Sequence, residues 1–223
     1  MGFNIAIDGP AGAGKSTIAR KVAEKLSFIY VDTGAMYRAI GLYMWRSEID
    51  VEDETAVEEA CKNVDVTIEY EDGEQQVLLN GDNVNDYIRN ELVGELTSKI
   101  STYPVVRNKL LELQRDMAKK GDVLMDGRDI GTNVLPEADL KIYLTADVKV
   151  RAQRRYLELQ RKGVESDIKE IEEDIMERDL RDMQRKIAPL KKAEDAIELN
   201  TSKLDINEVV DIVIDLVQEK RKV

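Results

Sequence analysis

Gly9-Pro-Ala-Gly-Ala-Gly-Lys15-Ser16 decides the fold, because it fits the G-x-x-x-x-G-K-[ST] pattern of a phosphate-binding loop. The apolar run Phe3 to Ile7, ending at Asp8, predicts a strand directly before it, and Ser16 to Leu26 follow at helical spacing. Glycines let backbone N–H groups converge on phosphate oxygens, and the helix N-terminus adds a positive dipole. The stretch therefore predicts a nucleotide phosphate site made of Gly9, Pro10, Ala11, Gly12, Ala13, Gly14, Lys15, Ser16 and Thr17.

The two residues that close this motif carry its chemistry. Lys15 is placed to reach the β- and γ-phosphates of ATP, and the Ser16 hydroxyl is placed to ligate Mg²⁺, a cation that prefers oxygen ligands. Switch GTPases, ATP-driven motors and small-molecule kinases all share the loop. The chain lacks an Asn-Lys-x-Asp guanine-reading motif, and its 223 residues are short for a motor. A kinase is favoured, and its second substrate has to be found elsewhere in the sequence.

Further short apolar runs alternate with helical patterns, which is typical of an α/β fold with buried parallel strands. The predicted strands after the first are Phe28 to Val31, Val123 to Met125, Leu140 to Leu144, and Ala196 to Leu199. The predicted helices run from Thr33 to about Trp45, Tyr103 to about Lys120, Lys149 to Lys162, and Ile168 to Lys186, with a last helix from Ile206 whose start carries an Asp205/Glu208 capping box.

The stretch from about Val64 to Val84 differs from its surroundings. Val64 to Tyr70 alternates, Glu71 to Glu74 reads as a turn, Gln76 to Leu79 returns, and Asn80-Gly81 signals another tight turn. This pattern predicts a small antiparallel meander inserted into the parallel chain.

Composition excludes several function classes. The chain carries 33 basic and 45 acidic residues, a net charge of −12, which disfavours general binding to nucleic acid or an anionic membrane. It has no histidine, which excludes Ser-His-Asp hydrolysis and histidine-ligated zinc, and its single cysteine excludes an intrachain disulfide. Without a signal-peptide pattern or a membrane-spanning apolar run, we expect a cytosolic protein.

Polar residues follow two predicted strands at their carboxyl ends, where an open parallel sheet forms its ligand crevice. Thr33, Tyr37 and Arg38 follow the second strand, and Asp126-Gly-Arg-Asp129 follows the Val123 strand. Asp126 sits where such enzymes often hold Mg²⁺ through water. The alternatives are a helix cap and solvated charges for the first group, and a polar turn with surface ion pairs for the second.

Two arginine clusters supply the local positive charge that an acidic nucleotide-binding protein needs. Arg178, Arg181, Asp182 and Arg185 recur at three- and four-residue steps on one helix face. The preceding helix carries Arg151, Arg154, Arg155 and Arg161. Taken singly, each arginine is more often part of a salt bridge than a ligand contact.

Four motifs in order along nearly the whole chain resemble the bacterial cytidylate kinases. They are Ile-Asp-Gly-Pro-Ala-Gly-Ala-Gly-Lys-Ser at 7–16, Asp-Thr-Gly-Ala-Met-Tyr-Arg at 32–38, Asp-Gly-Arg-Asp-Ile-Gly-Thr at 126–132, and Glu-Arg-Asp…Arg-Asp…Arg…Ala-Pro-Leu at 177–190. The inserted meander resembles the enlarged monophosphate-binding insert of those enzymes.

The resemblance implies a P-loop nucleoside monophosphate kinase fold: a five-stranded parallel sheet, an inserted small antiparallel sheet and a helical lid. It divides the chain into a core (1–34, 101–149 and 187–223), an insert (35–100) and a lid (150–186). It implies that Thr33, Arg107 and Asp129 meet cytosine, that Arg38 and Arg128 hold the CMP phosphate, and that Ser98, Arg178, Asp182 and Arg185 lie near the ribose. Thr33 stands where some members have serine, which keeps the hydroxyl.

The implied reaction is phosphorylation of CMP and dCMP by ATP with Mg²⁺. The acceptor is a phosphate oxygen that is already anionic, so no general base is needed, which fits a chain without histidine. We expect Lys15, Arg128, Arg178 and Asp182 to act at the reacting groups, and Arg154, Arg155 and Arg161 to close over the ATP phosphates. The partners expected are these nucleotides alone, with no nucleic acid or membrane, on a monomer. The alternatives are a P-loop kinase of UMP, AMP or an alcohol, and a nucleotide-binding switch without transfer activity.

Overall fold

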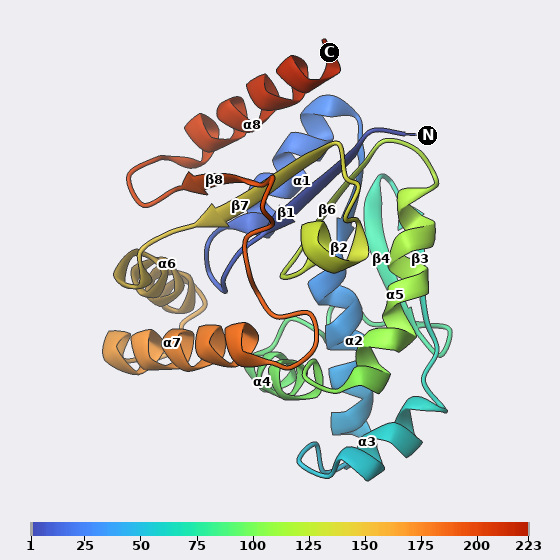
Figure 1. Cartoon of the computed structure of the whole chain (residues 1–223). Helices are drawn as coiled ribbons and strands as arrows, with labels where there is room; N and C mark the ends of the chain where they lie inside the picture. The colour runs from blue at the N-terminus through green and yellow to red at the C-terminus, as the bar shows by residue number, and fades with distance from the viewer. Residues whose placement is uncertain (1, 223) are drawn as a thin grey trace.

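The main sheet has five parallel strands, as predicted, with helices on both faces (Figure 1). The computed structural model describes residues 2–222. The sheet order is β2-β6-β1-β7-β8, so the central strand β1 has later strands on both sides. The strands are β2 (Ile29–Asp32), β6 (Val123–Gly127), β1 (Asn4–Asp8), β7 (Leu140–Thr145) and β8 (Ile197–Asn200).

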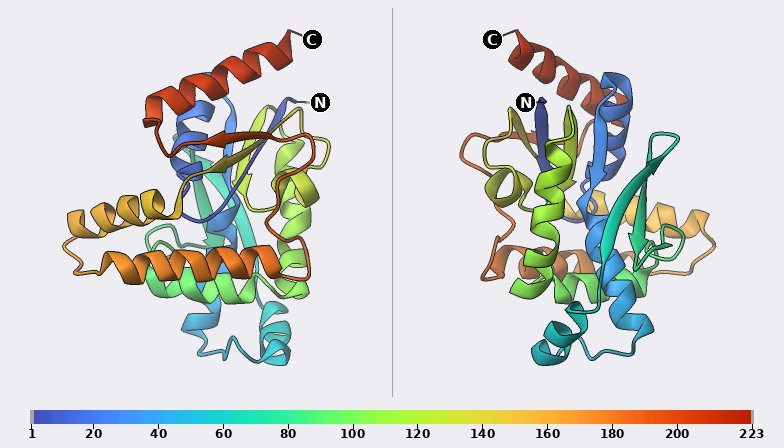
Figure 2. Two further views of the ribbon diagram at one scale, coloured as in Figure 1. Left: turned by 60° about the vertical axis from the view of Figure 1, so that its left-hand side comes forward. Right: turned by 90° about the vertical axis from the view of Figure 1, so that its right-hand side faces the viewer.

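Alternating side chains of the strands fill two separate cores, one on each side of the sheet. Ile5 and Ile7 of β1 point to the core formed with α1 (Lys15–Leu26) and α8 (Ile206–Arg221), whereas Ala6 points to the core formed with α2 (Thr33–Arg46) and α5 (Pro104–Ala118). Because both faces of the inner strands β1, β6 and β7 are buried, these strands are largely continuous apolar runs rather than alternating ones. The layered arrangement is visible in Figure 2.

The boundaries of the predicted elements differ from the observed ones by no more than two residues. The helix after the phosphate-binding loop begins at Lys15, one residue before the predicted start, because left-handed Gly14 is its N-cap. At α8 the predicted capping box is confirmed: Asp205 accepts from the N–H groups of Asn207 and Glu208, and the Glu208 carboxylate accepts from the Asp205 N–H.

The predicted meander is confirmed as a three-stranded antiparallel sheet of β3 (Val66–Glu71), β4 (Glu74–Leu79) and β5 (Asp82–Asn83). Its two turns are two-residue turns, Asp72-Gly73 and Asn80-Gly81, and all four residues have positive φ. Positive φ at both central positions gives the turn twist that suits the flanking strands, which is why Asp-Gly and Asn-Gly occur there.

Three helical elements were not predicted. They are α3 (Glu54–Cys61), α4 (Glu91–Ile100) and the π-helical turn η1 (Ile130–Val134). The caps of the first two, Asp53 and Asn90, accept backbone N–H groups and were readable signals. The π-turn has no comparable local signature.

Helices α6 (Val148–Arg161) and α7 (Ile168–Gln184) form a hairpin that projects from the sheet (Figure 2). Ala152 and Leu159 pack against Ile171 and Ile175 in a small core of their own. No helix within residues 2–222 has the length and apolar character needed to cross a bilayer.

Candidate active site

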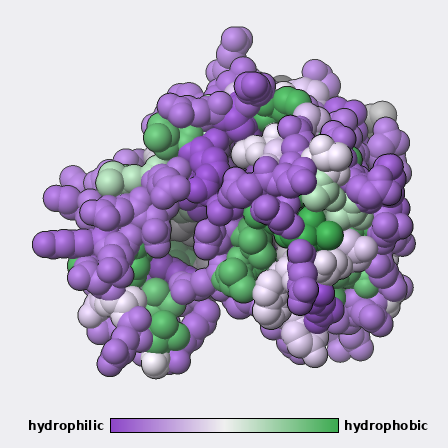
Figure 3. All heavy atoms as spheres, turned by 90° about the horizontal axis from the view of Figure 1, so that it is seen from below, coloured by the Kyte–Doolittle hydropathy of each residue, from purple (hydrophilic) through white to green (hydrophobic). Residues whose placement is uncertain are grey.

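A cleft of about 970 Å³ opens at the carboxyl ends of β1, β2 and β6. The strand register places Ile7 beside Asp126 and Asp32 beside Asp126, so the polar residues that end these strands lie at one level. In Figure 3 the molecule is seen from below, and hydrophilic side chains border a hollow on that face. Every predicted site residue lines the cleft except Gly9 and Pro10.

Glycines shape the phosphate-binding loop at its start and at its end. A Cβ at Gly9 would lie 1.9 Å from the Leu144 carbonyl oxygen, and Gly14 has a φ of +90°, so neither position accepts a side chain without strain. The loop therefore stays against β7 and presents the first N–H groups of α1 to the cleft.

Lys15 is buried at the base of this loop. Its Nζ donates to the Pro10 carbonyl oxygen at 2.7 Å. Burial lowers the pKa of Lys15 well below its ordinary value, and the positive charge of Arg128 lowers it further. Because the charged form of Lys15 is disfavoured by this burial, a bound anion would stabilise it strongly. This is the property expected of a lysine that binds phosphate.

Asp126 joins the loop to the neighbouring strands. Ser16 Oγ donates to one carboxylate oxygen of Asp126 at 3.0 Å, and the Tyr30 hydroxyl donates to the other at 2.8 Å. Burial, reinforced by the charge of Asp32, raises the pKa of Asp126 to about 6. A hydroxyl and a carboxylate facing the same space fit Mg²⁺, which takes few protein ligands beside phosphate and water. Residues 2–222 contain no cluster of three acidic or thiol ligands that would form a closed metal cage.

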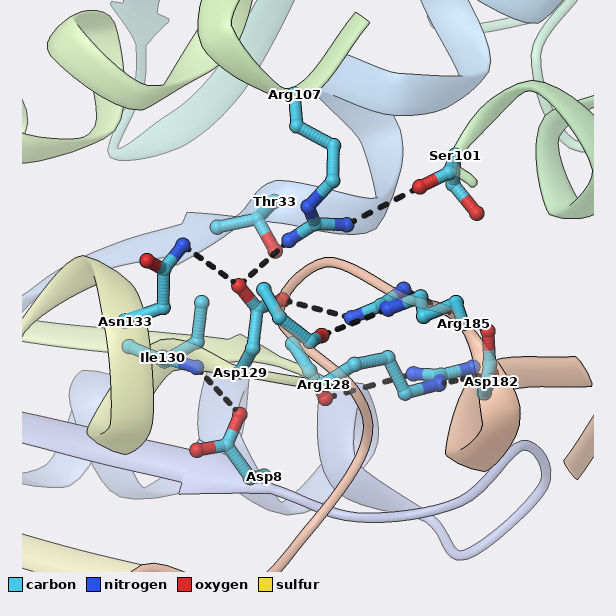
Figure 4. Close-up of polar contacts among 12 residues, drawn as sticks. Asp8, Thr33, Ser101, Arg107, Arg128, Asp129, Ile130, Asn133, Asp182 and Arg185 are labelled. Atoms are coloured by element: carbon cyan, nitrogen blue, oxygen red, sulfur yellow. Dashed lines mark hydrogen bonds and ion pairs between the residues drawn. The ribbon is translucent and has the colours of Figure 1, made fainter. Parts of the chain in front are cut away.

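Asp8 was not predicted to belong to the site, yet it organises the turn that follows Arg128 and Asp129. One carboxylate oxygen accepts from the N–H group of Ile130 at 2.7 Å (Figure 4), and the other accepts from that of Gly131 at 2.7 Å. Burial raises the pKa of Asp8 to about 6. The contact joins residues 122 positions apart, so only the β1–β6 pairing brings it about.

Asp129 is the centre of a buried polar network (Figure 4). One of its oxygens accepts from Arg107 at 2.5 Å and from Asn133 at 3.0 Å, and the other accepts from Arg185 at 3.0 Å. Each carboxylate oxygen can accept two hydrogen bonds, so the oxygen facing Arg185 retains one free acceptor direction. The guanidinium of Arg107 also lies over the Tyr37 ring, 5.5 Å from its centroid.

A group of arginines around the cleft is only partly neutralised. Arg128 donates to Asp182 at 2.9 Å, and Arg185 lies 3.7 Å from the same carboxylate. Burial opposes ionisation of Asp182, but these arginines hold its pKa below the ordinary value. The side chains of Arg38 and Arg178 have no such partner among residues 2–222: the buried Nε of Arg178 is unpaired.

The pKa values of two of these arginines are lowered, chiefly because the side chains are buried. Burial, followed by the charge of Arg128, lowers the pKa of Arg178 to about 10. Burial also lowers the pKa of Arg38, although Asp32 partly compensates for it. Arg128, Arg178 and Arg185 thus lie around the single carboxylate of Asp182. An added anion would balance their remaining positive charge.

The predicted lid arginines line the other side of the cleft. Arg154 donates to the hydroxyl and the carbonyl oxygen of Thr201, whereas Arg155 pairs with Glu91 at 2.7 Å and Glu158 at 2.8 Å. Arg161 also lines the cleft. Pairing with carboxylates is the salt-bridge alternative that the sequence left open for Arg155.

Sequence reasoning gave no role to several residues at or beside the cleft. Arg181, which was grouped with its neighbours but given no role, donates to the Ser98 hydroxyl at 2.9 Å. The hydroxyl of Thr33, a predicted site residue, donates to the Asp126 carbonyl oxygen at 2.7 Å. The segment after β8 lines one end of the cleft, and the predicted strand end there was the available signal; these residues are Thr201, Leu204, Asp205, Ile206, Asn207 and Val209.

A phosphate-binding loop at the end of β1, on a five-stranded parallel sheet and beside a second, cation-rich compartment in the same cleft, is the arrangement of a P-loop kinase. The sequence model described as cytidylate kinase matches residues 5–219, and the chain belongs to that family. It is therefore a nucleotide-binding phosphotransferase of the class that phosphorylates nucleoside monophosphates.

Relatives of the chain are similar over their whole length. A cytidylate kinase of Lactobacillus johnsonii is 50% identical over 99% of this chain and 96% of its own. One of Carboxydothermus hydrogenoformans is 48% identical over 99% of this chain and 100% of its own. A solved structure of an uncharacterized protein from Eubacterium ventriosum shares the fold, with a TM-score of 0.53 at 15% identity, covering 97% of this chain and 98% of that one.

Proposed function

We propose that this protein transfers the γ-phosphoryl group of ATP to CMP and dCMP, giving the diphosphates by direct in-line transfer with Mg²⁺. The observation that carries the proposal is the second compartment, where buried arginines without enough carboxylates adjoin the Asp129 network. The buried arginines suit an anion, and the Asp129 network suits a polar base. A nucleoside monophosphate carries both groups.

The acceptor phosphate would be held by Arg38, Arg128 and Arg178. The lowered pKa of two of them means that their charge is costly until a phosphate balances it. Guanidinium groups match phosphate oxygens in a bidentate manner. Ser98 and Asp182 would meet the ribose hydroxyls, with Arg185 fixing the carboxylate.

The base would be read by Asp129, Arg107 and Thr33. Cytosine has an amino donor at N4 and acceptors at N3 and O2, so the free acceptor direction of Asp129 suits the amino group and the guanidinium suits an acceptor. Uracil reverses the polarity at both positions and would leave buried groups unpaired. Asp129 and Arg107 already bind each other, so their orientation is fixed before substrate arrives.

The donor would lie on the loop, with Lys15 at the β- and γ-phosphates and Arg154, Arg155 and Arg161 closing over them. Ser16 and Asp126 would hold Mg²⁺, which neutralises charge on phosphate oxygens when bound. For Arg155 this requires exchange of Glu91 and Glu158 for phosphate, and Arg154 would have to leave Thr201.

Catalysis in this scheme is positioning and charge neutralisation. The attacking atom is an ionised phosphate oxygen, so no residue has to remove a proton. Lys15, Arg128 and Arg178 would stabilise the charge that spreads over the transferring group, while Asp182 keeps Arg128 in place. Closure of the α6–α7 hairpin would exclude water and so suppress hydrolysis of ATP.

The division into core, insert (35–100) and lid (150–186) belongs to the same proposal, as do the monomeric state and the cytosolic location. The insert would carry the acceptor contacts made by α2 and α4. The lid would carry the donor contacts of α6 and the acceptor contacts of α7.

A coupled ADP-release assay with CMP, dCMP, UMP and AMP as acceptors tests the function directly. We expect release that depends on the acceptor, with kcat/KM for CMP about 10²-fold or more above that for UMP, because two hydrogen-bond mismatches cost roughly 1–3 kcal/mol each. Release without any acceptor would identify a hydrolytic switch. Preference for UMP, AMP or an added alcohol would overturn the cytidine assignment.

A further inference from the structure

The edge of the main sheet next to the acceptor compartment is completed by side chains. Within residues 2–222, strand β2 has one strand neighbour, β6, and the backbone groups on its other side have no strand to pair with. Such groups need partners when they are covered. The β3–β4 hairpin covers this side of β2, and two of its side chains provide the partners: the Tyr70 hydroxyl donates to the Tyr30 carbonyl oxygen at 2.9 Å, and Gln75 binds Asp32.

Gln75 binds the backbone of Asp32 at two points. Its Oε1 accepts from the Asp32 N–H at 2.8 Å, and its Nε2 donates to the Asp32 carbonyl oxygen at 3.1 Å. These two groups belong to the peptide units on either side of Asp32. The planar amide of Gln75 therefore fixes both peptide units, as an adjacent strand would.

The residue held in this way begins the helix that faces the acceptor compartment. One carboxylate oxygen of Asp32 caps α2 by accepting from the Ala35 N–H at 3.0 Å, and the other accepts from Arg89 at 3.3 Å. The next residue is Thr33, and α2 also carries Tyr37 and Arg38, which line the cleft. A shift at Asp32 is transmitted to all three, because they belong to the first two turns of the same helix.

We propose that Gln75 is a positioning residue for the acceptor nucleotide: its amide fixes the end of β2 and thereby sets the place of Thr33 and Arg38. The inference rests on the proposed function, since it assigns these two residues to the acceptor. It also gives the inserted sheet a part in acceptor binding without contact to the substrate, because Gln75 itself does not line the cleft.

The neighbouring residue on the same strand provides a matched control. Gln76 is half-buried like Gln75, but its side chain points to the other side of the hairpin, where its Oε1 accepts from Asn83 and Asn85 at 2.9 Å each. Substitution at Gln76 therefore disturbs the insert without touching β2. Methionine is the appropriate replacement at both positions, since it has similar length and removes only the hydrogen-bonding atoms.

Steady-state kinetics on Gln75→Met, Gln75→Glu and Gln76→Met tests the inference in the whole chain. Gln75→Met should lower the thermal midpoint, because two covered backbone groups of Asp32 lose their hydrogen bonds. While leaving KM for ATP close to the parent value, it should raise KM for CMP about tenfold, because the end of β2 is no longer held in place. Gln75→Glu should raise it further, because a carboxylate cannot donate to the Asp32 carbonyl oxygen and adds negative charge beside Asp32. Gln76→Met should behave like the parent.

The outcomes separate this inference from the function on which it rests. If the parent protein shows no CMP-dependent ADP release, the proposed function fails. If the parent is active and Gln75→Met keeps its KM for CMP, or Gln76→Met raises it equally, the positioning role is overturned and the function stands. Equal increases of KM for CMP and ATP in Gln75→Met would likewise indicate general loosening and overturn it. Should Gln75→Met not fold, Gln75→Glu and direct calorimetric CMP binding give the same comparison.

Discussion

Replacing Asp126 by asparagine should make the protein more stable and less active. Asp126 is 3% exposed and its pKa is raised from 3.8 to about 6 by burial and by the charge of Asp32. A difference of this size corresponds to about 3 kcal/mol for keeping the charge in the folded state. The asparagine oxygen can still accept from Ser16 or Tyr30, but one of the two hydrogen bonds is lost, which costs about 1 kcal/mol.

The expected net gain is about 2 kcal/mol at pH 8, or a rise of roughly 4–8 °C in the thermal midpoint for a chain of this size. The sign depends on pH. Because the pKa of the folded state lies above that of the unfolded state, the parent protein is fully stabilised below about pH 4 and loses that stability as pH rises through about 6. The advantage of the variant should therefore disappear near pH 4 and be complete above pH 7.

Thermal unfolding of parent and variant between pH 4 and pH 8 measures this effect. Asp211→Asn is the control, because Asp211 lies in an exposed pair with Lys25 and should change stability by less than about 0.5 kcal/mol at any pH. A variant that is no more stable at pH 8, or whose advantage is the same at pH 4, would refute the reasoning. The coupled assay should show at least a 10²-fold loss of turnover, as expected for a residue that holds Mg²⁺.

Three further variants address the reacting groups and the base. Lys15→Ala should keep the fold and lower turnover by about 10³-fold or more, because it removes a buried cation from the transferring phosphoryl group; near-normal turnover in a folded variant would exclude this role. Joint replacement of Arg154, Arg155 and Arg161 by glutamine should lower turnover far more than CMP affinity measured by calorimetry, and unchanged turnover would leave them as structural salt bridges. Asp129→Asn should narrow the ratio of kcat/KM for CMP over UMP by about tenfold, mainly through loss with CMP, since an amide can donate to the uracil O4. Its thermal midpoint should fall because two buried arginines lose their counter-charge. A preserved ratio would show that Asp129 does not read the base.

The parts of the fold that could be predicted are those determined by residues close together in the sequence. The loop at 9–16 combines a strand, a glycine turn and a helix start, and the meander combines alternation with Asp-Gly and Asn-Gly turns. The short helices α3 and α4 carry caps, but no long apolar period accompanies them. The π-turn at 130–134 depends on the Asp8 carboxylate, which comes from the other end of the chain, so no local pattern could announce it.

The candidate site likewise has residues that local sequence could assign and partners that it could not. Residues at strand ends could be assigned to one cleft, because parallel strands end on the same side of a sheet. Their partners could not be assigned. Asn133 binds Asp129 because the π-turn directs it there, and the ion pair between Arg155 and Glu91 requires α4, which was not predicted. The sequence showed which arginines cluster near the site. Which carboxylate each of them faces depends on how α6 packs against α7.

The α6–α7 hairpin is anchored at its root to the phosphate-binding loop. Arg151 of α6 donates to the Ala11 carbonyl oxygen at 2.8 Å, and Asp179 of α7 accepts from the Ala11 N–H at 3.2 Å, while the two side chains pair with each other at 2.6 Å. Both helices thus bind the backbone of the same loop residue, Ala11. The turn that joins the two helices, residues 162–167, lies at the opposite end of the hairpin from this anchor. Under the proposed function, a movement of the hairpin that displaced its root would also displace the loop that holds the donor phosphates, and so would couple the two substrate sites at Ala11.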